Sequence, residues 1–417
     1  MASFSFGSGN AAKLLRIPLY AAGRTGTLLV PRGRRWVFGS AVGIGDGALA
    51  LWRVATAEGH DALWLVSTDR AAADAASAGI PTIRRDSWRG WWETARAEVI
   101  VVTHGQGDVN RYAVAGSFLV QLWHGIPLKR IGLDSPATTQ VPNVPGAGML
   151  RRIVEVLYRA TAQRIRLMPA ASDRARGRLE SAFALGEQRV VVTGEPRVDV
   201  LSAGTAEQRR ENASALLEEA TGPLPPGART ILYAPTWRDG EDDPAVPTAH
   251  EWVRIIAMLE RRDAVLFVRS HPLGAGAYRS PLPSARVRML GSSVLNDVTP
   301  ALPGIDVLVT DYSSMAYDAG LLAMPVLYLA PDAEEYAHSR GFYGRLEDVA
   351  AGGAVSDWDA LLDEIDGVLT DHRAFAEKAA RSHALSAQMH AYRDGGNTRR
   401  VYEAIRARGI PAPRGAR

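Results

Sequence analysis

The segment of residues 121–134, with the sequence QLWHGIPLKRIGLD, carries the residue types that proton transfer beside a phosphate ester requires. His124 follows an apolar run, residues 117–122, that predicts a buried strand. Lys129 and a neighbouring arginine come within the same short loop. An imidazole titrates near neutral pH, and a nearby cation stabilises phosphate charge. We therefore expect His124 and Lys129 to take part in phosphate chemistry, although Lys129 can instead pair with Asp134.

A predicted helix start in the second half of the chain is a candidate anion site. Residues 305–310 predict a buried strand, and Asp311 follows it directly. Ser313 and Ser314 then open a helix that we expect to run to about Leu322. Free backbone N–H groups and two hydroxyls at a helix start suit a pyrophosphate. The alternative is an ordinary serine cap with no ligand.

His271 closes a third predicted strand. Residues 264–268 predict the strand, and Arg269 and His271 follow it. Pro272 favours an extended conformation for His271, so we expect the imidazole to project from the end of the sheet. There it can donate a hydrogen bond to a phosphate oxygen or protonate a leaving group. The alternative is a histidine that is bonded to a loop carbonyl.

Two arginines follow further predicted strands. Arg238 comes after the strand predicted at 230–234, and its planar fork suits a phosphate unless it pairs with a neighbouring aspartate. Arg197 follows the strand predicted at 189–193 and has Asp199 as an alternative structural partner.

Short apolar runs that alternate with helical patterns predict parallel sheets covered by helices. The simplest architecture is α/β, with two doubly wound domains facing each other across a cleft. In such sheets ligands bind beyond the carboxyl ends of the strands. The polar residues expected at these ends are His104, His124, Arg197, Arg238, His271 and Asp311.

Composition excludes several classes of protein. The chain has 417 residues, 47% hydrophobic and 22% charged, which is typical of a soluble protein with two domains. It contains no cysteine, so disulfides and thiolate chemistry are excluded. We expect no metal, no cofactor and no nucleic-acid partner, because ligand-spaced histidines, a P-loop and interleaved exposed aromatics are missing. No apolar run is long enough to span a membrane, and no signal peptide is recognisable, so we expect a cytoplasmic protein.

The amino-terminal segment is basic and partly apolar. No acidic residue precedes Asp46, whereas Lys13, Arg16, Arg24 and Arg32 are interspersed with leucines and phenylalanines. Such a segment can lie on an anionic membrane surface, and a solvated tail is the alternative.

Six ordered blocks between about Thr103 and Asn397 resemble the CDP-glycerol glycerophosphotransferases, which include teichoic acid primases and polymerases. The blocks are WHGIPLK with GLD from Trp123, GEPRVD from Gly194, YAPTWR from Tyr233, RSHP from Arg269, DVLVTDYSS from Asp306 and YRDG from Tyr392.

The resemblance implies a GT-B-type fold with two Rossmann-like domains, and transfer of a polyol phosphate from a CDP-polyol to a hydroxyl, with release of CMP. It implies that His124 is the general base and that His271 acts with it in catalysis. The residues implied in substrate binding are Lys129, Arg197, Arg238, Arg269, Asp311, Ser313, Ser314 and, for the ribose hydroxyls, Asp318. The partners implied are CDP-glycerol or another CDP-polyol, a lipid-linked polymer acceptor and the anionic inner face of the cell membrane.

We expect four regions. These are a basic segment at 1–40, an acceptor-side domain at 41–204, a CDP-polyol-binding domain at 205–390, and a carboxy-terminal helix and tail at 391–417. The first alternative function is a GT-B glycosyltransferase that uses a nucleotide sugar. The second is a non-catalytic nucleotide- or carbohydrate-binding protein, which the presence of both His124 and His271 disfavours.

Overall fold

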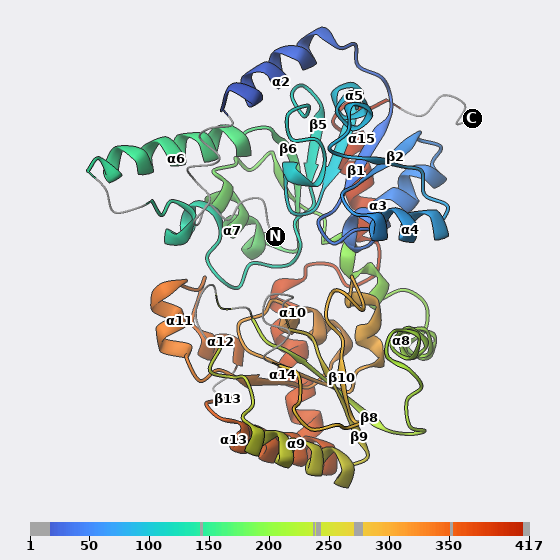
Figure 1. Ribbon diagram of the computed structural model, residues 1–417, viewed down its shortest axis with the longest axis vertical. Coiled ribbons are helices and arrows are strands. Elements are labelled where there is room, and N and C mark those ends of the chain that lie inside the picture. Colours follow the sequence, from blue (N-terminus) through green and yellow to red (C-terminus); the bar gives the residue numbers. More distant parts are fainter. Residues whose placement is uncertain are drawn as a thin grey trace. The chain divides into compact units, whose positions relative to one another are not determined.

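The computed structural model describes residues 17–141, 145–236, 238, 243–270, 278–350 and 353–411. The chain divides into two compact units, the first formed by residues 1–199 and 396–417 and the second by residues 200–395 (Figure 1). Each unit contains one sheet in which every strand pair is parallel. The α/β class predicted from the sequence is therefore confirmed.

The first unit alternates strands and helices along the chain. Its strands are β1 (Trp36–Gly39), β2 (Ala62–Val66), β3 (Thr82–Arg84), β4 (Val99–Val102), β5 (Phe118–Gln121), β6 (Ile165–Ala170) and β7 (Val190–Val192). Its helices are α2 (Ile17–Leu29), α3 (Asp46–Ala57), α4 (Asp69–Ser77), α5 (Trp88–Arg96), α6 (Ala147–Ala162), α7 (Asp173–Phe183) and α15 (Asn397–Arg406). Short 3-10 helices are η1 (Gln106–Asp108), η2 (Gly132–Asp134), η3 (Pro136–Thr138) and η4 (Pro196–Leu201).

The strand order of this sheet is β3-β2-β1-β4-β5-β6-β7. The order reverses between β1 and β4, which is the topological switch point where open α/β sheets bind ligands. Gly39 pairs with Val102, and Val102 pairs with Gln121, so β1, β4 and β5 end side by side. The residues that follow these three strands therefore meet at one edge.

One face of the first sheet is covered by α3, α4 and α15. Trp36, Phe38 and Trp64 from the strands pack in one apolar cluster with Leu51 of α3 and Ile405 of α15. Figure 1 shows α15, the red carboxy-terminal helix, beside the blue helix α3. The last helix of the chain thus completes the core of the first unit.

The second unit repeats the plan. Its strands are β8 (Arg229–Ala234), β9 (Ala264–Val268), β10 (Val287–Met289), β11 (Val307–Thr310), β12 (Val326–Leu329) and β13 (Ala354–Val355). Its helices are α8 (Ala206–Thr221), α9 (Ala249–Arg261), α10 (Met315–Ala319), α11 (Ala333–Ser339), α12 (Leu346–Ala350), α13 (Trp358–Thr370) and α14 (His372–Met389), with 3-10 helices η5 (Thr299–Gly304) and η6 (Gly320–Leu322).

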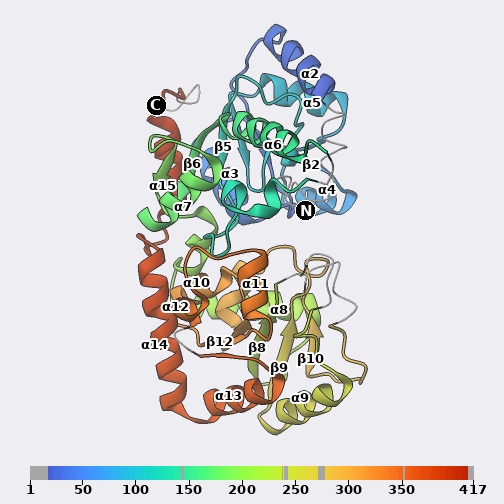
Figure 2. The same cartoon turned by 90° about the vertical axis from the view of Figure 1, so that its left-hand side faces the viewer.

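The order of the second sheet is β10-β9-β8-β11-β12-β13, so its switch point lies between β8 and β11. Trp252 of α9 and Trp358 of α13 lie in the apolar cluster on one face of this sheet. Helix α14 lies against α10, η6 and β12 (Figure 2).

Several strands escape prediction from sequence. The central strand β1 lies within the segment 1–40 and is only four residues long. Strand β6 contains Arg166 and Pro169, which argue against a strand when they are judged locally. Strands β3, β10 and β13 have three residues or fewer, too short to show a period. No helix within the described residues is long and apolar enough to cross a bilayer.

Candidate active site

His124 lies just beyond the carboxyl end of β5. The preceding residue, Trp123, has a φ of 65°, in the left-handed region, which costs a residue with a side chain of order 1 kcal/mol. Its indole is buried and packs edge-on against Phe183 of α7, with ring centroids 5.1 Å apart. This packing holds the turn that presents His124 at the edge of the sheet.

The ring of His124 stacks on a second imidazole. His104 follows β4, the neighbour of β5, and the two ring centroids lie 4.1 Å apart with planes within 2° of parallel. Both residues were expected at strand ends, but their contact was not predicted. It arises because adjacent parallel strands end at the same level, so residues distant in sequence meet there.

A buried carboxylate organises the turn that carries His104. Oδ2 of Asp108 accepts the backbone N–H groups of Thr103, His104 and Gly105, at 3.0, 2.7 and 3.2 Å. The Thr103 hydroxyl lies 2.8 Å from His104 Nδ1 and 2.9 Å from the hydroxyl of Ser40, at the end of β1. The turn therefore occupies the switch point between β1 and β4.

Both imidazoles are neutral at neutral pH. Burial lowers the pKa of His104 to about 4. Burial also lowers the pKa of His124 well below its usual value, as do the repulsion that a protonated His104 would exert and the charges of Arg197 and Lys129, whereas a hydrogen bond with the Thr103 backbone raises it. Arg197 and Lys129 thus lie near enough to His124 to disfavour its protonated form.

Arg197 has a different partner from the one considered from sequence. Its Nε donates to Oε2 of Glu195 at 3.0 Å, and both side chains are buried. Asp199 instead accepts the N–H groups of Asn397 and Thr398 at the start of α15. The sequence did not predict this use of Asp199, because it does not show that α15 returns to this edge, and a pairing of Arg197 with Asp199 stays a prediction.

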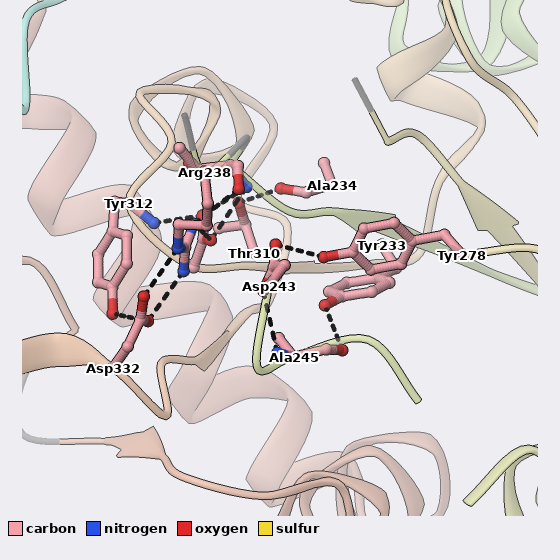
Figure 3. Close-up of polar contacts among 11 residues, drawn as sticks. Tyr233, Ala234, Arg238, Asp243, Ala245, Tyr278, Thr310, Tyr312 and Asp332 are labelled. Atoms are coloured by element: carbon pink, nitrogen blue, oxygen red, sulfur yellow. Dashed lines mark hydrogen bonds and ion pairs between the residues drawn. The ribbon is translucent and has the colours of Figure 1, made fainter. Parts of the chain in front are cut away.

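Arg238 lies at the switch point of the second sheet, between two carboxylates. Its Nε and Nη2 donate to the two carboxylate oxygens of Asp332 at 2.7 and 2.9 Å, and its Nη1 donates to Asp311 at 3.0 Å (Figure 3). Nη1 also donates to the carbonyl of Thr236 at 2.6 Å. Four of the five N–H groups of the guanidinium therefore bond to protein, so a direct phosphate contact by Arg238 stays a prediction.

Aromatic rings complete the surroundings of Arg238. The guanidinium carbon lies 4.9 Å from the ring centroids of both Tyr312 and Tyr336, and the Tyr312 hydroxyl donates to Asp332 at 2.8 Å. Burial disfavours the charged guanidinium, but the hydrogen bonds and charges of Asp332 and Asp311 outweigh it and raise the pKa of Arg238. Arg238 is thus a permanently charged centre that links β8, β11 and the start of α11.

The segment after Asp311 begins a shorter helix than expected. Helix α10 runs from Met315 to Ala319 and continues as η6 to Leu322. Ser314 occupies the N-cap position without a side-chain cap, and the Ser313 hydroxyl accepts the N–H of Met315 at 3.3 Å. Of the two serines expected at the start of this helix, Ser313 is therefore the one whose hydroxyl accepts a backbone N–H group of the helix.

Asp318 is buried on α10, where its Oδ1 lies 3.8 Å from Nε2 of His390, itself buried. Arg269 donates to the carbonyls of Leu290, Leu295 and Asn296 at 2.8 to 3.0 Å and so ties the end of β9 to a loop. His271 lies outside the described residues.

Sequence reasoning missed Asp108, Asp332 and Tyr336. Each lies outside the predicted motifs. Asp332 could have been noticed only because it comes shortly after β12, at the end of a strand. Among the residues that the structure describes, no group of three His, Cys, Asp or Glu side chains is arranged to hold a metal.

Three curated relatives are similar in sequence to parts of this chain. The chain is 31% identical over 193 residues to the teichoic acid ribitol-phosphate polymerase TarK of Staphylococcus aureus (strain NCTC 8325 / PS 47), covering 44% of this chain and 36% of that protein. It is 27% identical over 253 residues to a teichoic acid glycerol-phosphate transferase of the same strain, covering 59% and 61%. It is 26% identical over 291 residues to the teichoic acid poly(glycerol phosphate) polymerase of Bacillus subtilis (strain 168), covering 69% and 37%. The chain thus spans less than two thirds of these relatives.

Solved structures support the fold. The wall teichoic acid polymerase TagF superposes with a TM-score of 0.74 at 21% identity, covering 96% of each chain. A putative UDP-N-acetylglucosamine 2-epimerase from Listeria monocytogenes gives a TM-score of 0.52 at 16% identity, covering 92% of this chain and 99% of that one. The family model for CDP-glycerol:poly(glycerophosphate) glycerophosphotransferase matches residues 36–407. Because this match includes most of the sequence, the chain belongs to the CDP-glycerol:poly(glycerophosphate) glycerophosphotransferase family.

Proposed function

We propose that the protein transfers a polyol phosphate from a CDP-polyol to a hydroxyl of a membrane-linked polymer such as teichoic acid, and releases CMP. Glycerol phosphate is the polyol phosphate that we favour. One observation carries the proposal beyond family membership. His124 lies beyond the carboxyl end of β5 and stacks on His104 with ring centroids 4.1 Å apart, and burial and the charges of Arg197 and Lys129 lower its pKa. A base must be unprotonated before it can accept a proton, and cations beside it stabilise a transferring phosphoryl group.

In the proposed reaction His124 accepts the proton of the acceptor hydroxyl. The hydroxyl oxygen forms a bond to the β-phosphorus, the bond from that phosphorus to the bridging oxygen breaks, and CMP leaves with the electron pair. Lys129 and Arg197 stabilise the charge on the transferring phosphoryl oxygens. The proton on His124 then passes to solvent, which restores the neutral base.

Residues of the second unit hold the donor in this proposal. Ser313 and Ser314 supply hydroxyls near the start of α10, Asp318 reaches the ribose, and His271 neutralises the pyrophosphate. Arg238 holds the Asp311 carboxylate at 3.0 Å, and Asp311 also accepts the N–H of Thr236 at 2.9 Å. Arg238 and Asp311 thereby hold Thr236, just after β8, beside the turn after β11, which carries the serines.

A donor panel tests the reaction. Purified protein is given a lipid-linked acceptor and CDP-glycerol, CDP-ribitol, UDP-glucose or GDP-mannose, and nucleotide release is measured by chromatography. Release of CMP from a CDP-polyol, with an acceptor that gains one phosphate per CMP, supports the proposal and identifies the polyol. Turnover with a nucleotide sugar alone contradicts it and favours a glycosyltransferase.

We also propose that the first unit docks on an anionic membrane surface, through α6. Val154 and Tyr158 bury one face of this helix. On the opposite face Met149, Ile153 and Val156 are 72%, 40% and 63% exposed and follow helical spacing. Arg152 and Arg159, both exposed, lie on the same helix. An apolar stripe with flanking arginines suits an interfacial helix.

The basic residues nearer the amino terminus serve the fold as well. Arg32 donates to the carbonyl of Ala97 at 3.1 Å, and Arg35 pairs with Asp61 and Glu93 at 2.8 and 2.9 Å. Deletion of the whole segment 1–40 would remove α2 and β1 and thus disrupt the sheet.

The membrane test therefore uses two separate changes, deletion of residues 1–16 and serine replacement of Met149, Ile153 and Val156 together. The triple variant is expected to bind phosphatidylglycerol vesicles about tenfold more weakly in sedimentation, because loss of apolar burial of about 1.4 kcal/mol has that effect. The deletion is expected to weaken binding if the basic terminus contributes. Serine replacement of the exposed Val253 on α9 in the second unit is the control. Unchanged binding by the triple variant would exclude α6 as the docking surface.

A further inference from the structure

We propose that His104 is a positioning residue for His124, holding its imidazole in the plane and protonation state needed to accept the acceptor proton. The inference rests on the proposed function for its catalytic meaning. It rests on geometry for the pairing itself, since the rings lie 4.1 Å apart and are parallel to within 2°. The flat ring of His104 restricts tilting of the His124 ring against which it lies. The two residues follow different strands, β4 and β5.

The anchoring of His104 is stronger than that of an ordinary surface histidine. Its backbone N–H and its ring Nδ1 are both held, by Asp108 at 2.7 Å and by the Thr103 hydroxyl at 2.8 Å. Ser40 fixes Thr103 in turn, at 2.9 Å. A hydrogen-bonded series thus runs from β1 through β4 to the ring that faces His124.

Close packing leaves this turn little freedom. A Cβ atom added to Gly39 would lie 2.3 Å from the backbone oxygen of Asp108, so the end of β1 and the loop after β4 approach each other too closely for any side chain. Gly105 has a φ of 145°, which other residues rarely adopt. The end of β1 and the loop after β4 are therefore held in one arrangement, which fixes the place of His104.

The pairing also controls protonation. His104 covers part of His124 from water, and burial is the largest cause that lowers the pKa of His124. The other charged groups that act on His124 are Arg197 from η4 and Lys129 from the loop after β5, and both disfavour a second positive charge. Because His104 is itself neutral, with a pKa of about 4, the pair carries no positive charge at neutral pH until His124 takes a proton from the acceptor.

The test compares His104→Ala, which removes the ring, with His104→Phe, which keeps a flat ring without nitrogen. His60→Phe is the matched control. His60 is a buried histidine of the first unit, with its ring 4.6 Å from that of Trp36 and its Nε2 3.1 Å from the Tyr402 hydroxyl. For each variant kcat, KM for the CDP-polyol and the pH profile of kcat are measured, together with the thermal midpoint of unfolding.

We expect His104→Ala to lower kcat by about tenfold to a hundredfold through misorientation of the base, with donor KM within about twofold. The acidic limb of its kcat profile should move to higher pH, because water replaces the ring and the pKa of His124 rises. His104→Phe should recover most of kcat, and His60→Phe should keep the wild-type profile. A His104→Ala enzyme with wild-type kcat and profile would overturn the proposal. A His104→Phe enzyme as inactive as His124→Ala would also overturn it and make His104 itself the proton carrier.

Failure of the proposed function can be told apart from failure of this inference. If the wild-type protein releases no CMP from any CDP-polyol, the proposed function fails. The pairing is still decided by NMR titration of the imidazole resonances in the wild type and in His104→Ala. A rise in the titration pH of His124 in the variant supports the pairing, and an unchanged titration pH overturns it.

Discussion

Each of the two sheets has a topological switch point, but the side chains at the two switch points create different electrostatic environments. At the switch point of the first sheet, two neutral imidazoles stack in a buried turn, and the cations near His124 lower its proton affinity. At the switch point of the second sheet, Arg238 is bonded to Asp311 and Asp332 and lies between two tyrosine rings.

The difference shows that the same sheet topology can hold either a neutral imidazole or a fixed, ion-paired arginine at its switch point. Arg238 has compensated charge, so its environment stabilises a fixed ion and ties three segments together. Burial and the charges of Arg197 and Lys129 lower the pKa of His124, so its environment favours the neutral base. We infer that the first switch point is built for proton transfer and that the second is built to fix the loops that hold the donor.

The sharpest test of the first switch point is His124→Ala. We expect kcat to fall about a thousandfold, within the range for loss of a general base, while the dissociation constant for the CDP-polyol changes little. Chromatographic CMP release and calorimetric donor binding measure the two quantities. His372→Ala, on the exposed start of α14, is the control. CMP release within tenfold of wild type would remove His124 as the base.

The corresponding test of the second switch point is Arg238→Met. It leaves the buried Asp311 and the partly buried Asp332 without their cation, so we expect the free energy of unfolding of the second unit to fall by about 3 kcal/mol. Urea denaturation measures the loss, and hydrogen exchange assigns it to a unit. Arg254→Met, which breaks an exposed ion pair with Asp359, should leave the midpoint nearly unchanged. Equal effects of the two variants would contradict a special role for the Arg238 cluster.

A pH series separates the two regions further. The pKa of His104 is about 4 when folded and about 6.5 when unfolded, so below pH 6.5 the unfolded chain binds a proton that the folded chain does not. The stability given by the neutral ring is therefore lost as pH falls toward 4. Burial raises the pKa of Asp108 to about 6, and this acts in the opposite direction between pH 6 and 4.

His104→Phe removes only the histidine contribution. Relative to wild type, its free energy of unfolding should improve by about 2 to 3 kcal/mol between pH 7 and pH 4. Urea midpoints at several pH values measure this change, with His372→Phe as the exposed control. A difference that does not vary with pH would show that His104 is not held neutral by burial.

The smallest expected effect is that of Asp332→Asn. The amide oxygen still accepts from Tyr312 and Arg238, and Arg238 still pairs with Asp311. The substitution removes one negative charge and one strong hydrogen bond. We expect a loss of about 1 to 2 kcal/mol in urea denaturation. Double-mutant analysis with Arg238→Met should then show strong coupling, and additive effects would mean that the two residues act independently.

Local sequence patterns predicted much of the molecule. Apolar runs of strand length found β5, β7, β8, β9 and β11, and the polar residues expected at strand ends correctly indicated the edges that carry His104, His124 and Arg238. They succeed because the side-chain period and the residues that stop a strand are properties of neighbouring residues.

The sequence by itself therefore determined the α/β class, the strand ends and the residue types available at them. The tertiary structure decided which of these residues meet. Arg238 and Asp332 are 94 positions apart, and the return of α15 to Asp199 joins residues 199 positions apart. Whether an arginine is free to bind phosphate or is held by carboxylates, and whether a histidine is neutral, depends on burial and charge that only packing supplies. The stack of His104 on His124 also depends on the tertiary structure, because it forms only when two adjacent parallel strands end at the same level.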